Sequence, residues 1–282
     1  MNPGSTPSGV MSVSSDDPLL PLLDSVHRRF GAVVDAVFLY GSWRRGRRDT
    51  MPDFYVLLRE YPSGIKYFPG RLLPPTVLVL QGGELRAKVT VLLTSELARA
   101  VASDFHPYFW ARFAQPAPLL YVREPTVGKQ CEAIRDAAAV RLTRIVATWW
   151  QGHAVPPAAE FWQQGFTLTY GAELRSEPPE RIAALYAADC AHYDTLYSRW
   201  AQPQGGALSR LSWRLRQTVG KMLSGIRIVK AALTFEDPLD YLAWKVGRQS
   251  GVQLEPGTLA RRWPLLFGWS YVFRLWRAGG FR

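Results

Sequence analysis

The sequence predicts an α/β (α+β) fold, with a mixed sheet near the N-terminus, a mostly helical part after it and an amphipathic tail. Short apolar runs separated by Gly- and Pro-rich turns predict strands up to about residue 125. From Val127 onward, apolar residues recur at helical spacing. We therefore expect a disordered lead-in over residues 1–18, a sheet domain over 19–125, a helical domain over 126–260 and a tail over 261–282.

The sheet domain is expected to contain short apolar segments bounded by turn residues. They are a helix over 19–30, strands over 33–40 and 54–58, a hairpin over 76–93, and a short helix with a strand within 109–122. The hairpin should turn at Gly82 and Gly83. A further helix should begin directly after the hairpin, with Thr94 or Ser95 as its N-cap.

The helical domain is expected to contain five amphipathic segments. They cover residues 131–150, 156–170, 180–200, 213–235 and 238–250. The first helix should expose Arg135, Arg141 and Arg144 on its outer face. Residues 202–206 should form a flexible break.

Composition restricts the class of protein. The chain has 282 residues, of which 48% are apolar, so it can bury one large core or two ordinary ones. Its 34 Lys and Arg outnumber 23 Asp and Glu, which favours an anionic partner such as a nucleotide, nucleic acid or membrane. A generically basic soluble protein would have the same balance. Cys131 and Cys190 lie far apart, so neither a structural disulfide nor a zinc site is expected, as in a reducing cytoplasm.

The most informative segment runs from residue 37 to residue 58. An apolar run ends at Gly41 and Ser42, a basic turn follows, and a second apolar run begins at Asp53. Glycine lets the backbone approach a phosphate closely, and Ser42 adds a hydroxyl and an N–H. Asp53 can hold a divalent cation, usually Mg²⁺, against the same phosphates. Nucleotidyltransferases with a polymerase-β-like fold bind nucleoside triphosphates with this arrangement.

Two features of the segment leave another reading open. Such nucleotidyltransferases usually carry a second carboxylate two residues after the first, where the two side chains share a face of the strand. Tyr55 occupies that position here. A Gly-Ser turn before an acidic residue also occurs in ordinary surface hairpins, so the segment alone does not separate the two readings.

Several further segments occur in the order typical of one family. They cover residues 38–42, 53–56, 85–91, 108–116, 170–175 and 230–234. Together they resemble the mitochondrial-type phosphatidate cytidylyltransferases, also called CDP-diacylglycerol synthases, which have bacterial relatives. In that family an apolar residue replaces the second acid, as Tyr55 does here. Trp43 is a departure, because the family has a small residue after Gly-Ser.

The resemblance implies roles for residues near the triphosphate. Gly41 and Ser42 would cradle the β- and γ-phosphates of CTP, and Asp53 would bind Mg²⁺ and be catalytic. Lys88, on a strand expected beside Asp53, would neutralise the α-phosphate or the lipid phosphate. Arg44 and the other arginines of the same turn would attract the anions, or they would form a solvated basic loop.

The resemblance also implies an acceptor site. Arg112, Arg175 and Lys230 are candidates to bind the lipid phosphate, although each has the alternative of an ordinary surface cation. Glu173 would be a second metal ligand that replaces the missing acid, or it would cap a helix or form a salt bridge.

The tail over residues 261–282 mixes arginines with Trp, Tyr and Phe. Such a segment suits the headgroup layer of an anionic membrane. A C-terminal helix packed on the core is the alternative, and binding of single-stranded nucleic acid is a weaker one. Residues 1–18 lack the patterns of a secretory signal or a transit peptide, and no apolar run approaches the ~20 residues of a bilayer span.

These expectations combine into one functional hypothesis. The chain would be a peripheral membrane enzyme that transfers CMP from CTP to phosphatidate, with Mg²⁺ as cofactor. It would act on the cytoplasmic face of a bacterial membrane, or on the matrix side in mitochondria. The alternatives are an enzyme of the same fold acting on another lipid phosphate, and a catalytically inert module that binds a membrane or RNA.

Overall fold

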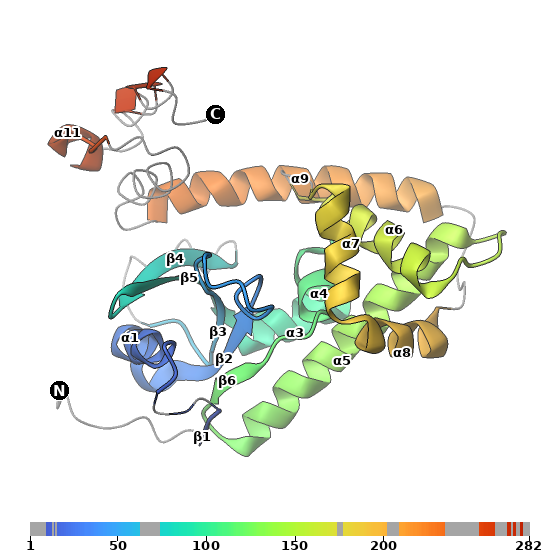
Figure 1. Ribbon diagram of the computed structural model, residues 1–282, viewed down its shortest axis with the longest axis horizontal. Helices are drawn as coiled ribbons and strands as arrows, with labels where there is room; N and C mark the ends of the chain where they lie inside the picture. The colour runs from blue at the N-terminus through green and yellow to red at the C-terminus, as the bar shows by residue number, and fades with distance from the viewer. Residues whose placement is uncertain are drawn as a thin grey trace.

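The computed structural model describes most of the chain. The described residues are 10–12, 14, 16–62, 74–173, 177–201, 209–234, 254–262, 270–271, 273–274 and 277–278. They form an α+β structure around a six-stranded mixed sheet with the strand order β1-β6-β2-β3-β5-β4 (Figure 1). The strands are β1 Val10–Met11, β2 Val34–Tyr40, β3 Asp53–Leu58, β4 Thr76–Gly82, β5 Leu85–Leu93 and β6 Leu119–Val122.

The middle of the sheet brings three predicted segments side by side. Strand β2 pairs antiparallel with β3, so that Tyr40 lies opposite Asp53. Strand β3 pairs in parallel with β5, so that Asp53 lies beside Lys88. The predicted hairpin is confirmed as β4 and β5, with Gly82 opposite Leu85. Asp53 and Lys88 therefore share one face of the sheet at the end where β3 begins.

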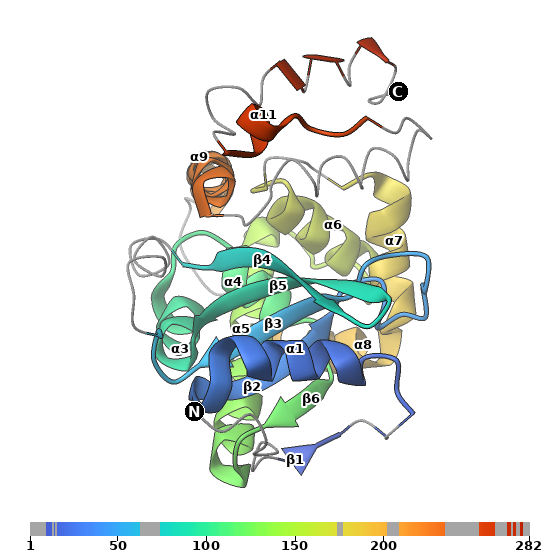
Figure 2. The ribbon, with the colours of Figure 1, turned by 90° about the vertical axis from the view of Figure 1, so that its left-hand side faces the viewer.

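Helices cover both faces of the sheet (Figure 2). Helix α1 (Leu20–Phe30) packs its buried Leu22 and Leu23 in a core with Phe54 and Val56 of the sheet. It lies so close to β4 that a Cβ added at Gly82 would come 2.3 Å from a backbone oxygen of Pro21. The opposite face is covered by α3 Thr94–Ser103, α4 Tyr108–Phe113 and α5 Pro125–Ala147.

Of the remaining helices, three extend the second layer away from the sheet and a fourth runs back beside β4 (Figure 1). They are α6 Ala158–Tyr170, α7 Pro179–Ala188, α8 Cys190–Trp200 and α9 Ser209–Thr234, with α11 Thr258–Arg262 near the C-terminus and 3₁₀ turns at Gly31–Val33 and Thr148–Trp150. One apolar cluster runs from Phe38 and Tyr55 of the sheet through Trp110 to Trp162 and Tyr193 of the helical part. Helix α5 does begin at the expected boundary, but the core continues across it.

The structure corrects several local expectations. Val10 and Met11 pair with Val122 and Tyr121 of β6, so disorder over residues 1–18 does not hold at these two positions. The N-cap of α3 is Leu93, whose N–H donates to the Glu96 carboxylate at 2.9 Å. Neither residue expected at the cap takes that role, and the Thr94 hydroxyl instead donates to Asp35 at 2.7 Å.

Two corrections concern the helical part. The helix expected over residues 180–200 is two helices, α7 and α8, which are separated at Asp189. Arg141 of α5 is not a solvated outer residue, because its guanidinium donates to the carbonyl of Asp104 at 2.6 Å and lies over the Trp110 ring.

Some expectations lie outside the described residues. They are the helix over 238–250, the break over 202–206 and much of the tail over 261–282. Within the described ranges, no helix combines the length and apolarity that a bilayer span requires.

Candidate active site

The Asp53 carboxylate lies directly against the turn at Gly41. Gly41 has φ +81°, and a Cβ added there would come 2.7 Å from Oδ2 of Asp53. The contact follows from the antiparallel register, which places Asp53 opposite Tyr40 at the end of β2. Only a residue without a side chain fits this position, because φ is in the left-handed region and the space is filled by the carboxylate. The sequence predicted this proximity, and the structure contains it.

The loop after Gly41 is tightly folded by its own hydrogen bonds. The N–H groups of Arg45 and Arg47 both donate to the Ser42 carbonyl, at 3.0 and 3.1 Å. The hydroxyls of Ser42 and Thr50 share a hydrogen bond of 2.8 Å across the loop. These bonds hold the Ser42 hydroxyl close to the start of β3, near Asp53.

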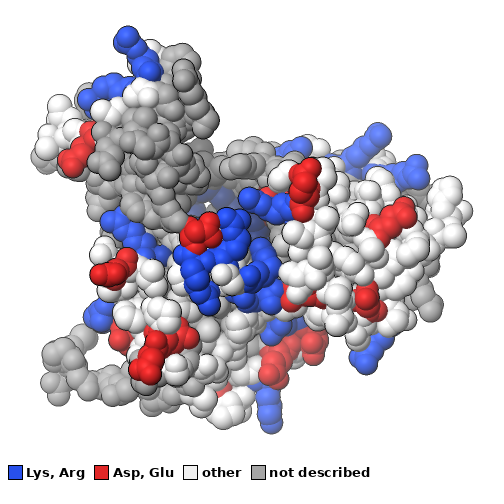
Figure 3. Space-filling view, viewed as in Figure 1, with Lys and Arg blue, Asp and Glu red and all other residues white. Residues whose placement is uncertain are grey.

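A cavity of about 360 Å³ opens beside this turn. Its sheet-side wall includes Gly41, Ser42 and Asp53, and its helix-side wall includes Arg112, Glu173 and Arg181. Lys and Arg side chains gather at the centre of the face that Figure 3 shows, over the loop between β2 and β3. The volume suits a ligand of small-molecule size, and the basic rim suits an anion.

Lys88 pairs with Asp53 at the edge of this site. Its Nζ lies 3.3 Å from Oδ1 of Asp53, and 48% of its side chain is exposed. Desolvation is the largest single effect and opposes the charge of the ammonium, but Asp53 and Tyr108 together outweigh it and raise the pKa of Lys88. Lys88 is therefore a charged ammonium at neutral pH, beside the carboxylate on the neighbouring strand.

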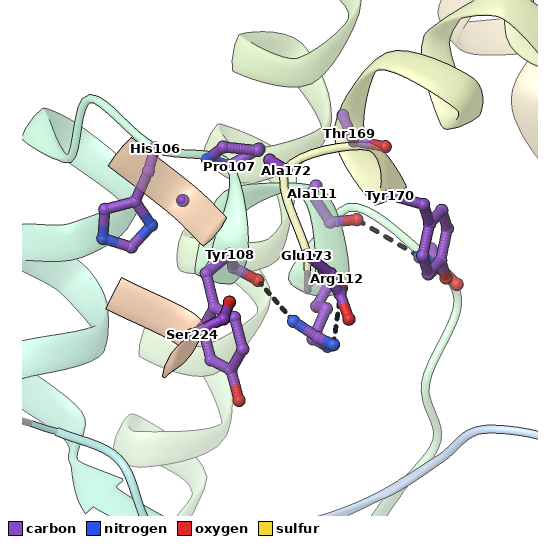
Figure 4. Close-up of a pocket in the computed structure, with 12 residues that line it drawn as sticks. His106, Pro107, Tyr108, Ala111, Arg112, Thr169, Tyr170, Ala172, Glu173 and Ser224 are labelled. Atoms are coloured by element: carbon purple, nitrogen blue, oxygen red, sulfur yellow. Dashed lines mark hydrogen bonds and ion pairs between the residues drawn. The ribbon is translucent and has the colours of Figure 1, made fainter. Parts of the chain in front are cut away.

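Arg112 is held by an acid and a ring (Figure 4). Its Nη2 lies 2.6 Å from Oε1 of Glu173, and its guanidinium carbon lies 4.1 Å from the centre of the Tyr108 ring. Burial would lower the pKa of Arg112, but the acidic groups of Tyr55 and Glu173 raise it well above the usual value. The guanidinium is thus a fixed positive charge in the wall of the cavity.

A second and much smaller cavity lies against the same pair. It has a volume of about 10 Å³, and Tyr108, Arg112 and Glu173 share its wall with Gly220 and Ser224 of α9 (Figure 4). Arg112 and Glu173 line both cavities. Helix α9 therefore reaches the back of the candidate site.

The donor set fits an ion that arrives with a nucleotide. Asp53 and Glu173 line one cavity, as the resemblance implied, but Glu173 is paired with Arg112. Among the described residues there is no group of three His, Cys, Asp or Glu side chains that would hold a metal ion. Mg²⁺ commonly keeps its water and is bound by one or two carboxylates plus substrate phosphates, so Asp53 is a sufficient protein ligand for that mode.

Among the described residues, three predicted site residues are absent from the cavity wall: Lys88, which lies beside it through its pair with Asp53, and Arg44 and Lys230. Arg44 forms a salt bridge with Asp189 between α7 and α8, and it is absent from the cavity wall. Lys230 is buried on α9 and donates to the Pro75 carbonyl at 2.7 Å. Burial lowers the pKa of Lys230 to about 8, with Arg227 adding to the effect. Arg175 lies outside the described residues.

The two departures from the usual motif are both accommodated by packing. Trp43 is 5% exposed and belongs to the core under α1, so its bulk is directed away from the cavity. Tyr55 is buried on the other face of the sheet from Trp43, the face that α4 covers, where its ring packs edge-on against Tyr40 and Phe113. Tyr55 therefore fills the position of a second acid with an aromatic contact.

Sequence reasoning missed part of the helix-side wall. Tyr170, at the end of α6, lines both cavities and accepts a hydrogen bond from Gln115 at 3.1 Å. Glu177, Arg181 and Leu185 line the larger cavity from α7 and the residues before it. Arg181 and Leu185 are four residues apart on α7, which places them on one helix face, and the sequence did contain that signal.

A comparison with protein-family models finds no family that matches the chain, and a comparison with curated proteins finds no match. The argument for a function therefore rests on the residues and their geometry.

Proposed function

We propose that the chain is a nucleotidyltransferase with a polymerase-β-like fold that transfers CMP from CTP to phosphatidate, giving CDP-diacylglycerol and pyrophosphate. The observation that carries the proposal is the Asp53 carboxylate lying against Gly41, where an added Cβ would be 2.7 Å from Oδ2. The mixed sheet supports it, because the antiparallel β2–β3 pair with a parallel β5 places Lys88 beside that carboxylate. The order of the family-like segments along the chain supports the choice of substrates.

The proposed reaction balances without a general base. An oxygen of the phosphatidate monoester attacks the α-phosphorus of CTP, and a new P–O bond forms. The bond from the α-phosphorus to the bridging oxygen breaks, and pyrophosphate leaves with the electron pair. A phosphate monoester has a second pKa of about 6, so the nucleophile is already a dianion near neutral pH. The barrier is mainly the approach of two polyanions.

The residues of the cavity and the neighbouring Lys88 address that charge problem. The Gly41–Ser42 turn offers backbone N–H groups and the Ser42 hydroxyl to the triphosphate. Mg²⁺, held through Asp53, would supply the divalent charge that the phosphates need. Lys88 and Arg112 are fixed positive charges from the sheet and from α4, and they would orient the two phosphates toward each other.

A direct assay tests the proposal. The purified protein is incubated with labelled CTP, Mg²⁺ and detergent-dispersed phosphatidate, and the lipid fraction is analysed for a CDP-lipid. Asp53→Asn removes the charge with little change in volume, and we expect it to lower the rate at least about a hundredfold. Asp49→Asn is the matched control, because Asp49 lies on the same loop but is exposed and paired with Arg47.

The outcomes separate the alternatives named above. Product with another lipid phosphate but not with phosphatidate would change the acceptor and keep the reaction. Absence of product with every acceptor, together with no Mg²⁺-dependent binding of CTP by calorimetry, would overturn the proposal in favour of an inert module. Full activity of Asp53→Asn would remove Asp53 from the site.

A further inference from the structure

Helix α9 carries an exposed apolar stripe along its length. Leu211, Leu215, Met222 and Ile226 have exposed fractions of 52%, 50%, 60% and 48%. Successive members are separated by four, seven and four residues. At 100° per residue they fall within a sector of about 60°. Four large apolar side chains thus line up on the surface of one helix.

A row of cations runs beside this stripe. Arg210, Arg214 and Lys221 are exposed, and each directly precedes a member of the stripe, which places the row along one border of it. The helix sequence from Ser209 to Thr234 contains no Asp or Glu. From Arg210 to Ile226, the outer face therefore carries an apolar stripe with a positive border.

The inner face of the same helix is fixed to the protein. Trp213 is 1% exposed, and a Cβ added at Gly220 would come 2.5 Å from the Ala172 carbonyl. Ser224 lines the small cavity behind Arg112 and Glu173. Helix α9 runs along one edge of the molecule, beside β4 and α6 (Figure 1). These contacts orient the stripe outward and hold it there.

We propose that the outer face of α9 docks on an anionic lipid bilayer. The stripe enters the headgroup layer, and Arg210, Arg214 and Lys221 contact lipid phosphates. A second copy of the chain fits less well, because two such faces would bring like charges together. RNA fits less well, since the stripe offers no aromatic ring for base stacking. The membrane contact predicted from the sequence was assigned to the tail, whereas this surface lies on a described helix.

The docking surface gives the proposed function a route for its acceptor. This step rests on the proposed function. Helix α9 presents the proposed lipid-binding side chains outward. On its inner face, Gly220 and Ser224 line the small cavity. Arg112 and Glu173 line both this small cavity and the larger one. Docking through α9 would therefore bring the Arg112–Glu173 pair close to the bilayer surface, while CTP enters from the basic face that Figure 3 shows.

Vesicle binding tests the surface without any nucleotide. The full chain is sedimented with vesicles of phosphatidylcholine alone and with vesicles containing about one third phosphatidylglycerol. Each cation near an anionic surface contributes roughly a fivefold factor, so Arg214→Gln with Lys221→Gln should weaken binding to the anionic vesicles about thirtyfold. Leu215→Ser with Met222→Ser should weaken binding to both kinds at least about tenfold.

A matched pair of charges provides the control. Lys129 and Arg199 are exposed on α5 and α8, and changing both to Gln removes the same net charge from other surfaces. Anionic-vesicle binding should change less than about twofold in this control. An equal loss in the control, unchanged binding in both α9 variants, or conversion of a dimer to a monomer by Leu215→Ser with Met222→Ser would each overturn the proposal.

The two proposals fail separately. If vesicle binding follows these expectations and no CDP-lipid is formed, the docking surface stands and the proposed function is wrong. If the enzyme is active, the α9 variants should turn over a water-soluble short-chain phosphatidate normally but lose turnover on vesicles. Equal loss on both substrates would show that α9 serves the cavity rather than the membrane.

Discussion

Gly41 and Asp53 share one small volume at the start of β3, and their contact can be separated experimentally from backbone strain. Gly41→Ala would place a methyl group 2.7 Å from Oδ2 of Asp53 at a residue with φ +81°. We expect Mg²⁺-dependent binding of CTP to weaken at least about tenfold, because the carboxylate must move. Calorimetric titration of the variant with CTP and Mg²⁺ measures this.

Gly46 supplies the control for that variant. It lies on the same loop with φ +86°, and a Cβ added there meets nothing within 4 Å. Gly46→Ala therefore introduces similar left-handed strain, of about 1–2 kcal/mol, without touching the carboxylate. Both variants should lose similar thermal stability, while only Gly41→Ala should lose nucleotide affinity. Equal affinities in the two variants would refute the role of the Gly41–Asp53 contact.

Because His106 is buried, we expect it to make the free energy of unfolding depend on pH. It is 8% exposed, and burial together with Arg227 lowers its pKa to about 4, against the opposing effect of Asp104. Between pH 4 and the unfolded pKa of about 6.5 the unfolded chain binds more protons, so stability falls as pH falls through this window. The contribution is on the order of 3 kcal/mol.

His106→Gln should remove this component. Carboxylates also titrate at low pH, so the informative quantity is the difference between the two proteins. The free energy of unfolding, measured by urea denaturation from pH 4 to pH 7, should fall less steeply with acid in the variant. Parallel curves would show that the imidazole accepts its proton in the folded state without penalty.

The Gly-Ser motif and the family resemblance pointed to several residues that lie together, but they did not give the contacts among them. Gly41, Ser42, Asp53, Arg112 and Glu173 line one cavity, as their assigned roles require. A salt bridge was one of three alternatives for Glu173, beside a metal ligand and a helix cap, and the structure pairs it with Arg112. Only the fold brings their two segments together, and no local pattern encodes that distance.

The junction of α7 and α8 explains why one expected helix is two. Asp189 has φ −140° and ψ 34°, which lies outside the helical range, and its carboxylate pairs with Arg44 of the loop between β2 and β3. Apolar periodicity continues through the junction, so the sequence predicted an unbroken helix. The residue at the interruption has its partner 145 positions away in the chain. Strands and hairpins were predicted more accurately, because their turn signals are local.

The Arg44–Asp189 pair predicts a pattern of mutant effects. If the pair joins the loop to the helices, Arg44→Gln and Asp189→Asn should each lower stability by about 1–2 kcal/mol, and the double variant should lose little more. Chemical denaturation of the four proteins gives the coupling energy. If Arg44 instead binds nucleotide directly, Arg44→Gln would lower CTP affinity while Asp189→Asn would leave it unchanged.

At the scale of the molecule, the larger of the two apolar clusters in the described residues joins the sheet to the helical part. Phe38 and Tyr55 of the sheet belong to the same apolar cluster as Trp162, Tyr193 and Trp213. The sequence predicted a boundary near residue 125 from a change in periodicity, and helix α5 begins there. Periodicity reports the kind of element and not what its apolar face contacts, so it does not separate two domains from two parts of one.

The shared core predicts that the two parts do not fold separately. A fragment of residues 1–125 would keep α3 and α4 but lose α5, which packs against both of them and against β2. The fragment would then expose apolar side chains of the shared cluster such as Trp110, and it would lose part of the burial that offsets chain entropy, so we expect no cooperative melting of the fragment. The intact protein should show one calorimetric transition whose van't Hoff and calorimetric enthalpies agree. Two transitions, or a fragment that melts cooperatively and binds CTP with Mg²⁺, would establish two independent domains, and the cavity would then open and close as they move.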